Sequence, residues 1–195
     1  FRRVNTIGTL NLAKEAAIAG VKRFIFISTI KVLGEQTEPG QAFKSGDSFN
    51  PQDPYSISKA EAEVGLKLIG EAHGMEVVII RPPLVYGKGV KGNFASLLEL
   101  ARFPIPLPFG SIQNKRSLVS VDNLVDLIVI CLNHPNAKNQ CFLVSDDDDM
   151  STSTLFSRLA EAGGYKAYMF KFPLTILNIS LRVLGKSSIY ERLCG

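Results

Sequence analysis

The first part of the chain alternates between helical and extended hydrophobic patterns. Residues 4–19 place apolar side chains at helical spacing and Gly20 follows as a C-cap, so we expect a helix there. Arg23 to Ser28 is a short apolar run, typical of a strand buried on both faces of a parallel sheet. The stretch from Gly34 to Pro54 is rich in Gly, Pro, Ser, Asn and Asp without a period, which predicts a loop.

A second helix and strand follow that loop. The pattern predicts a long helix from Tyr55 to His73, opened by Pro54 and closed by Gly74. Glu76 to Arg81 then reads as a second buried strand. Helix, strand, helix, strand at these lengths predicts an α/β fold, with part of a doubly wound, Rossmann-type parallel sheet.

After Pro82 the chain becomes rich in Pro and Gly, which favours a smaller C-terminal substrate-binding lobe. We therefore predict a Rossmann-type domain over 1–86 and a lobe over 87–195, with Ser117–Ser145 partly returning to the main domain. Two later strands are expected, at 117–121 and 140–145. Four later helices are expected: one at 94–102, one that Asp122 caps and that ends at His134, one that Ser151 caps and that ends at Ala162, and a packed amphipathic helix within 172–185.

Composition narrows the function classes. The 22 basic and 18 acidic residues give a net charge of +4, and they are scattered, which makes a nucleic-acid partner a poor expectation. The apolar stretch at 172–185 is too short to span a membrane, for which about 20 residues are needed. Three cysteines without metal-type or disulfide spacing favour a cytoplasmic location. The chain opens without Met on Phe-Arg-Arg-Val-Asn and shows no secretory signal, so we expect a fragment of a longer protein.

Two further patterns have ordinary interpretations. The acidic run Asp146–Asp149 predicts a solvated turn, with metal binding as the alternative, because consecutive carboxylates point in different directions. We expect no metal.

Gly87–Gly92 has the spacing G-x-G-x-x-G, but it does not join a strand to a long helix, so we interpret it as a substrate loop.

Tyr55 and Lys59 carry the candidate chemistry. Four residues apart on one helix, they share a face, and only Tyr55 among the five tyrosines has Lys at the fourth following position. An ammonium beside a phenol lowers its pKa and makes it a usable base. An ordinary surface pair is the alternative. Ser28 and Thr29 lie at the end of a predicted strand, where α/β sheets bind ligands, so one hydroxyl could bind a substrate, or the pair could simply form a turn.

Four motifs in one order carry a family resemblance. They are Val4-Asn5-Thr-Ile-Gly8-Thr9, Phe-Ile-Phe-Ile-Ser28-Thr29, Pro54-Tyr55-Ser-Ile-Ser-Lys59-Ala-Glu61 and Ile80-Arg81-Pro82-Pro83-Leu-Val-Tyr86-Gly87. Together they resemble the extended short-chain dehydrogenases/reductases, the NAD-dependent epimerases and dehydratases that include UDP-glucose 4-epimerases. Segments at 92–94 and 116–123 resemble that family's nucleotide-sugar-binding segments.

The resemblance implies a role for each matching residue. Tyr55 would be the general base, Lys59 would lower its pKa and hold the nicotinamide ribose, and Thr29 would bind the reacting sugar hydroxyl. Asn5 would support the strand that carries the site, and Ser28 would assist at the cofactor. The remaining expected contacts are Pro82 and Pro83 with the cofactor, and Leu84, Asn93 and Arg116 with the substrate.

The function implied is NAD-dependent epimerisation at C4 of a UDP-hexose or UDP-N-acetylhexosamine through a 4-keto sugar. The product would serve polysaccharide biosynthesis. The enzyme would be a homodimer that pairs through helices of the Rossmann domain. Val32-Leu33-Gly34 departs from the family's Val-Tyr-Gly, and Ile30-Lys31 replaces the Asp-Glu of 4,6-dehydratases, which disfavours dehydration. The chain also lacks the Gly-rich strand-turn-helix that holds a pyrophosphate. Rival functions are a nucleotide-sugar 4-reductase, a hydroxysteroid-type dehydrogenase and a non-catalytic binding module.

Overall fold

The computed structural model describes residues 1–38, 40–89, 93–103 and 105–194. The chain forms two compact units, one of Phe1–Pro83 with Val119–Ser145 and one of Leu84–Leu118 with Asp146–Gly195. The sequence-based boundary lies slightly later, after Tyr86, with the returning segment at Ser117–Ser145. We describe each unit by itself.

The first unit alternates helices and strands. Its elements are the π-helix η1 (Arg3–Gly8), α1 (Thr9–Ile18), β1 (Arg23–Ile27), the 3-10 helix η2 (Ile30–Val32), α2 (Pro54–His73), β2 (Glu76–Arg81), α4 (Val121–Asn133), the 3-10 helix η3 (Pro135–Ala137) and β5 (Cys141–Leu143). Two further short strands are β3 (Leu84–Tyr86), at the start of the second unit, and β4 (Leu118–Ser120), where the chain returns to the first.

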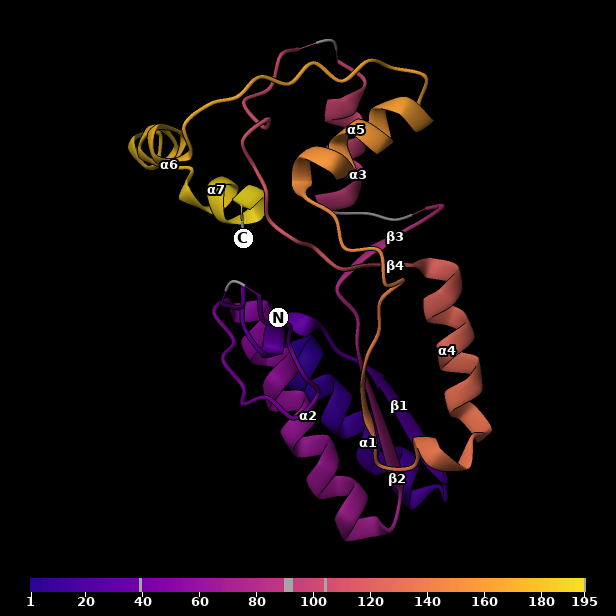
Figure 1. Ribbon diagram of the computed structural model, residues 1–195. Helices are drawn as coiled ribbons and strands as arrows, with labels where there is room; N and C mark the ends of the chain where they lie inside the picture. Colours follow the sequence, from indigo (N-terminus) through magenta and orange to yellow (C-terminus); the bar gives the residue numbers. More distant parts are fainter. Residues whose placement is uncertain (39, 90–92, 104, 195) are drawn as a thin grey trace. The chain divides into compact units, whose positions relative to one another are not determined.

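The main sheet has the order β1-β2-β5, and both pairings are parallel (Figure 1). The register aligns Arg23 with Glu76 at one end of β1 and Ile27 with Ile80 at the other. Each connection in this sheet therefore has to cross over through a helix, as the helix–strand alternation predicts. The α/β expectation is confirmed, and the described residues include three parallel strands of a Rossmann-type sheet.

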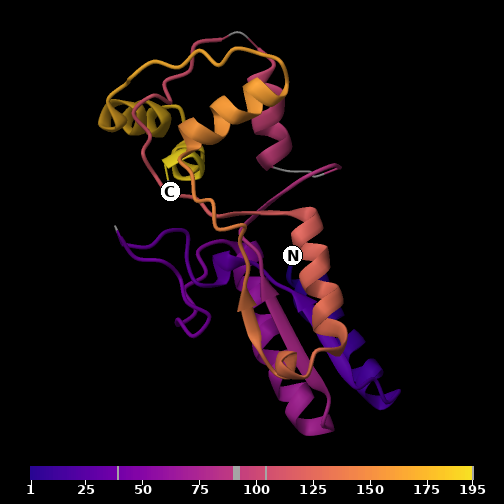
Figure 2. The ribbon, with the colours of Figure 1, turned by 45° about the vertical axis from the view of Figure 1, so that its right-hand side comes forward.

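Helices cover both faces of this sheet (Figures 1 and 2). On one face α1 and α2 pack on each other, and Ala13, Leu66 and Phe26 belong to one buried cluster that also takes side chains of β2. The two helices approach so closely at Gly65 that a methyl group there would come within 2.6 Å of a Leu10 methyl carbon. On the other face α4 contacts β1.

Local signals set the ends of α2. Asp53 is the N-cap, and its side chain accepts a hydrogen bond from the Ser56 backbone N–H while Ser56 Oγ accepts one from the Asp53 N–H, which is a capping box. Pro54 occupies the first helical position. Gly74 ends the helix with φ 67°, a left-handed conformation that glycine adopts without strain. The predicted bounds of this helix are confirmed.

Two details of the helices differ from expectation. The predicted first helix begins with a π-helical segment, Arg3–Gly8, in which backbone hydrogen bonds join residues five apart instead of four. The N-cap of α4 is Ser120 and not Asp122, because the Ser120 hydroxyl accepts from the Asn123 N–H and Asp122 already lies inside the helix. At its other end, Arg23 donates to the carbonyl of Cys131, where a cation complements the helix dipole.

The second unit contains α3 (Asn93–Ala101), α5 (Thr152–Ala162), α6 (Leu174–Val183) and α7 (Ser187–Cys194). Ser151 caps α5 as predicted, accepting from the Thr154 N–H. The expectation of a packed helix near the C-terminus is only partly met, since Leu177 is the one residue of α6 described as buried and Val183 is 82% exposed. Among the helices described, none is both long and apolar enough to cross a membrane.

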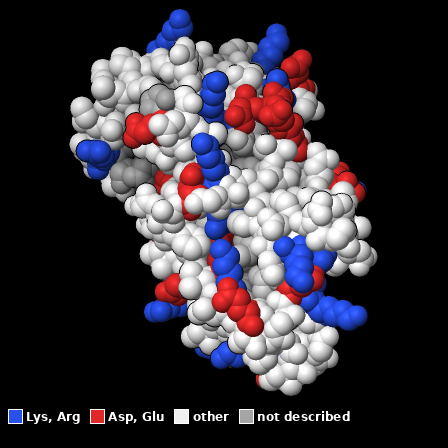
Figure 3. All heavy atoms as spheres, turned by 60° about the horizontal axis from the view of Figure 1, so that its bottom comes forward, with Lys and Arg blue, Asp and Glu red and all other residues white. Residues whose placement is uncertain are grey.

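Acidic and basic side chains are interspersed on the surface shown in Figure 3. Lysine and arginine do not gather into a continuous stripe on the described part of that face. This distribution matches the scattered charge of the sequence.

Candidate active site

The carboxyl end of β1 carries the two candidate hydroxyl groups. Hydrogen bonding between β1 and β2 continues beyond the strands, from the Ser28 N–H to the Ile80 carbonyl (2.7 Å) and from the Ile30 N–H to the Pro82 carbonyl (3.0 Å). Ser28 and Thr29 are both buried, and the Ser28 hydroxyl has no hydrogen-bond partner in the described structure. A buried hydroxyl without a partner is costly, so it marks a position where a ligand could bind.

Tyr55 lies in the first turn of α2, and Lys59 lies one turn later. The Lys59 ammonium donates to the Ile27 carbonyl over 2.8 Å and lies 4.5 Å from the centre of the Phe26 ring. Since Ile27 is the last residue of β1, this hydrogen bond ties the helix that carries Tyr55 to the strand end that carries Ser28 and Thr29.

In the described structure the Lys59 ammonium is not among the groups that shift the Tyr55 pKa, so the expectation that it lowers this pKa stays a prediction. Burial raises the pKa of Tyr55 and the Asp53 carboxylate raises it further, while the charge of Lys31 lowers it. Burial also lowers the pKa of Lys59, against the opposing effect of Glu63. The Lys59 ammonium binds a main-chain carbonyl, and the Tyr55 ring packs edge-on against Phe1 with a centroid distance of 5.7 Å.

Asn5 supports the helix and not the strand, which corrects the sequence-based role. Its side-chain amide donates to Ser58 Oγ over 3.1 Å, and Ser58 Oγ donates to the Tyr55 carbonyl over 2.7 Å. Thr6, the next residue in η1, donates to the Ser58 carbonyl over 2.9 Å. Both contacts fasten the π-helical segment to the part of α2 between Tyr55 and Lys59.

A buried ion pair behind the site was missed in the sequence. Arg81 and Glu63 are 2% and 0% exposed, and the guanidinium donates to both carboxylate oxygens, the shortest contact being 2.6 Å. Arg81 also donates to the Ser45 carbonyl over 3.0 Å and lies 5.3 Å from the Phe49 ring centre. The pair joins α2, β2 and the loop before Tyr55. The only sequence signal for it was a charged residue at each of two otherwise apolar positions.

Pro82 and Pro83 end the first stretch of unit one, and the Pro82 carbonyl is the acceptor for Ile30. Apart from Thr29, the expected substrate residues belong to the other unit. Leu84 packs beside Phe94 and Leu118, and Arg116 exchanges two backbone hydrogen bonds with Met150. Asn93 opens α3, but its side chain and residues 90–92 of the predicted loop at Gly87–Gly92 lie outside the described residues.

The acidic run is engaged in local contacts. Asp146 accepts from the Tyr86 hydroxyl, Asp149 accepts from Ser117 Oγ, and Asp148 pairs with Arg158. Asp147 has φ 59°, as in a tight turn. Across the ranges the structure describes, no group of three or more metal-binding side chains comes together.

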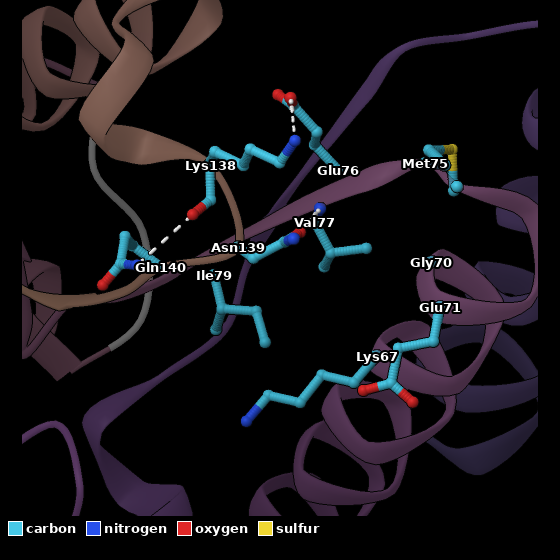
Figure 4. A pocket seen from close by; sticks show the side chains of 11 residues that line it. Lys67, Gly70, Glu71, Met75, Glu76, Val77, Ile79, Lys138, Asn139 and Gln140 are labelled. Carbon is cyan, nitrogen blue, oxygen red and sulfur yellow. Dashed lines mark hydrogen bonds and ion pairs between the residues drawn. The ribbon is translucent and has the colours of Figure 1, made fainter.

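A pocket of about 420 Å³ opens at the amino ends of β2 and β5 (Figure 4). In it the Asn139 side-chain oxygen accepts from the Val77 N–H over 2.9 Å, and Lys138 reaches Glu76 over 3.4 Å. Lys67 and Glu71 of α2 form its other wall. None of the predicted site residues lines this pocket.

The parallel sheet with helices on both faces, and Lys59 bonded to the end of β1, are those of a Rossmann-type α/β protein. The chain belongs to the NAD dependent epimerase/dehydratase family, whose model matches residues 1–144. It is 55% identical over 196 residues to a UDP-glucose 4-epimerase of Vibrio cholerae, and this match covers 100% of the chain and 60% of that protein. The chain thus spans well under two thirds of this relative.

Two solved structures share the fold. A UDP-glucose 4-epimerase of Thermotoga maritima with UDP-glucose has a TM-score of 0.72 and 26% identity, with 88% of this chain and 58% of that chain covered. A UDP-glucose 4-epimerase of Thermus thermophilus complexed with NAD has a TM-score of 0.74 and 25% identity, with 87% and 57% covered.

Proposed function

We propose that the full-length protein containing this chain is an NAD-dependent epimerase that inverts C4 of a UDP-hexose or UDP-N-acetylhexosamine. One observation carries the proposal: Lys59 joins the helix of Tyr55 to the end of β1, where the Ser28 hydroxyl is buried without a described partner. The 55% identity to a UDP-glucose 4-epimerase supports the choice of reaction.

The residues at this strand end fit a nicotinamide cofactor. An unpartnered buried hydroxyl at Ser28 could bond the cofactor, and Lys59 could exchange the Ile27 carbonyl for ribose hydroxyls. Pro82 and Pro83 would border the nicotinamide, and Asn5 would act on it only through α2. When bound, NAD would supply a hydride acceptor and donor for the sugar C4.

Tyr55 and Thr29 would handle the substrate hydroxyl. Thr29 would orient the C4 hydroxyl by a hydrogen bond, and Tyr55 would take its proton as C4 is oxidised to the 4-keto sugar, then return a proton when C4 is reduced from its other face. Because the Tyr55 pKa is raised, we expect turnover to increase with pH until the phenol ionises. Leu84, Asn93 and Arg116 remain our candidates for the sugar nucleotide, with Arg116 suited to a phosphate.

The test uses the full-length protein with UDP-glucose, UDP-galactose and their N-acetylated forms. We expect Tyr55→Phe to reduce kcat by about 100-fold to 10,000-fold, the usual range for a general acid–base group, without loss of folding. Tyr168→Phe is the matched control, since that ring is 49% exposed in the other unit. Absence of epimer formation in the unmodified protein would refute the proposal, and stoichiometric consumption of NADPH would instead indicate a 4-reductase. Nucleotide-sugar binding without NAD binding or turnover would indicate a non-catalytic module.

We also propose that the protein forms a homodimer through α1 and α2. Ile57, Val64 and Leu68 follow each other at helical spacing on α2 and are 42%, 48% and 61% exposed, and Leu12 on α1 is 63% exposed. Replacing Leu68 with Glu should convert a dimer to a monomer in sedimentation measurements, whereas Val129→Glu on α4 should not. A monomeric unmodified protein would contradict this.

With three free cysteines, we expect the protein to act in the cytoplasm.

A further inference from the structure

Lys31 contacts the surroundings of both candidate reaction groups. Its backbone N–H donates to Thr29 Oγ1 over 3.4 Å, which caps η2. Its ammonium donates to Asp53 Oδ2 over 2.7 Å. Asp53 is the N-cap of α2 and precedes Tyr55 by two residues. One residue therefore links the hydroxyl of Thr29 to the first turn of the helix that carries the phenol.

The ammonium of Lys31 is held between two carboxylates. Glu35 Oε1 and Asp53 Oδ2 both lie 2.7 Å from Lys31 Nζ, and the three side chains are between 34% and 40% exposed. Burial alone would raise the pKa of Asp53, but the hydrogen bonds from Lys31 and Ser56 outweigh it and lower that pKa. Asp53 is therefore an anion at neutral pH, and the Lys31 ammonium offsets its charge.

The charged groups around Tyr55 come from two elements. On α2 these are the cap Asp53 and, one turn on, Lys59, whose ammonium is engaged by the Ile27 carbonyl. Lys31 lies in η2, and its ammonium also pairs with Glu35. The segment before α1 contributes only an uncharged contact, the Phe1 ring. Burial raises the pKa of the phenol most, and Asp53 and Lys31 then have opposite effects on it, so a change in either charge should shift that pKa.

We propose that Lys31 is a positioning residue of this centre: its side chain ties η2, which follows Thr29, to the N-cap of α2 and provides the cation that pairs with Asp53, two residues before Tyr55. The inference rests on the proposed function for its catalytic consequence. Lys59 keeps the role of joining α2 to β1.

The experiment measures the pH dependence of kcat in the full-length protein for Lys31→Met and Asp53→Asn. Removing the cation should move the rise of kcat to higher pH by about half a unit or more, and removing the carboxylate should move it to lower pH by a similar amount. Asparagine caps helices as well as aspartate does, so Asp53→Asn should preserve α2. Lys31→Arg should restore the original profile, and both shifts should shrink at high salt because these side chains are partly exposed.

Lys138→Met is the matched control, because it also removes one ammonium from a pair with a carboxylate, at the opposite end of the sheet. Its profile should match that of the unmodified protein. A purely structural role for Lys31 would lower kcat without displacing the profile. Shifts of equal sign in Lys31→Met and Asp53→Asn, or none in either, would overturn the inference.

A second readout separates this inference from the proposed function. The ultraviolet absorbance of tyrosinate is measured as a function of pH in each variant and in the same variant carrying Tyr55→Phe. The difference between the two curves reports the ionisation of Tyr55 alone. The same opposite shifts are expected in the phenol pKa. If the unmodified protein lacks epimerase activity, the proposed function fails, and this titration still decides the role of Lys31. If activity is present but the phenol pKa does not move, only the inference fails.

Discussion

The two ends of the parallel sheet in the first unit carry similar polar side chains, which differ in their exposure and in their hydrogen-bond partners. At the amino end, Lys138 is 62% exposed beside Glu76, and the Asn139 side chain is used to hold the N–H of Val77. At the carboxyl end, Lys59 is directed to a main-chain carbonyl and the Ser28 hydroxyl is buried without a described partner.

A hollow in the surface thus lies at one end of the sheet, and the candidate polar groups lie at the other. The described pocket lies at the amino end, where the hydrogen bonds serve to join β2 to the segment before β5. Open α/β sheets bind ligands at the carboxyl ends of their strands, and there the chain has the Ser28 and Thr29 hydroxyls, with Lys59 bonded to the last carbonyl of β1. The following predictions test this comparison.

The largest effect should come from breaking the buried pair behind the carboxyl end. Glu63→Gln leaves the Arg81 guanidinium buried without its counter-charge, so we expect the free energy of unfolding to fall by about 3–5 kcal/mol. Lys138→Met, which removes an exposed partner at the amino end, should change it little. Urea unfolding curves of the full-length variants measure both. Equal losses in the two variants would mean that burial does not distinguish the two ends.

The next effect concerns catalysis. Lys59→Met removes the ammonium that joins α2 to the Ile27 carbonyl and that would hold the cofactor ribose, so kcat should fall by about 100-fold or more. Lys67→Met, on the same helix but in the wall of the amino-end pocket, should retain nearly full activity. Steady-state kinetics with UDP-glucose and UDP-galactose compares them. Similar losses in both variants would contradict a special role for the carboxyl end.

The smallest effect on stability should come from Ser28→Ala. Because the Ser28 hydroxyl is buried without a described partner, its removal should not lower the free energy of unfolding. The same change should weaken NAD binding to the full-length protein by about threefold to tenfold, as expected for one lost hydrogen bond. Thermal unfolding and calorimetric titration measure the two quantities. A large loss of stability would show that the hydroxyl is already bonded within the protein.

The sequence predicted best those features that local chemistry determines. The bounds of α2 follow from Pro54 and Gly74, and those of β2 from an uninterrupted apolar run, so both agree with the structure. The cap of α4 was misplaced by two residues, because serine and aspartate are both good caps and only the backbone conformation at Ser120 distinguishes them. The π-helical turns of η1 leave no signal that distinguishes them from an α-helix.

The partners of the site residues could not be predicted, because they depend on contacts between distant parts of the chain. Tyr55 and Lys59 were found from their spacing, but the acceptor of Lys59 is 32 positions away. The same holds for Asn5, whose amide reaches Ser58 across 53 positions. Spacing therefore identifies candidate groups on one helix, whereas the electrostatics around them requires the fold.

The hydrogen bond from Arg81 to the Ser45 carbonyl has a consequence for redesign. It anchors the long segment before Tyr55 to a rigid strand, and the Phe49 ring lies near the same guanidinium. Grafting this segment from a relative with another sugar preference should succeed when the donor segment presents a carbonyl and a flat ring at these two places. A donor that supplies neither would leave a buried guanidinium proton without an acceptor, and the chimera should then be recovered in poor yield whatever its sugar preference.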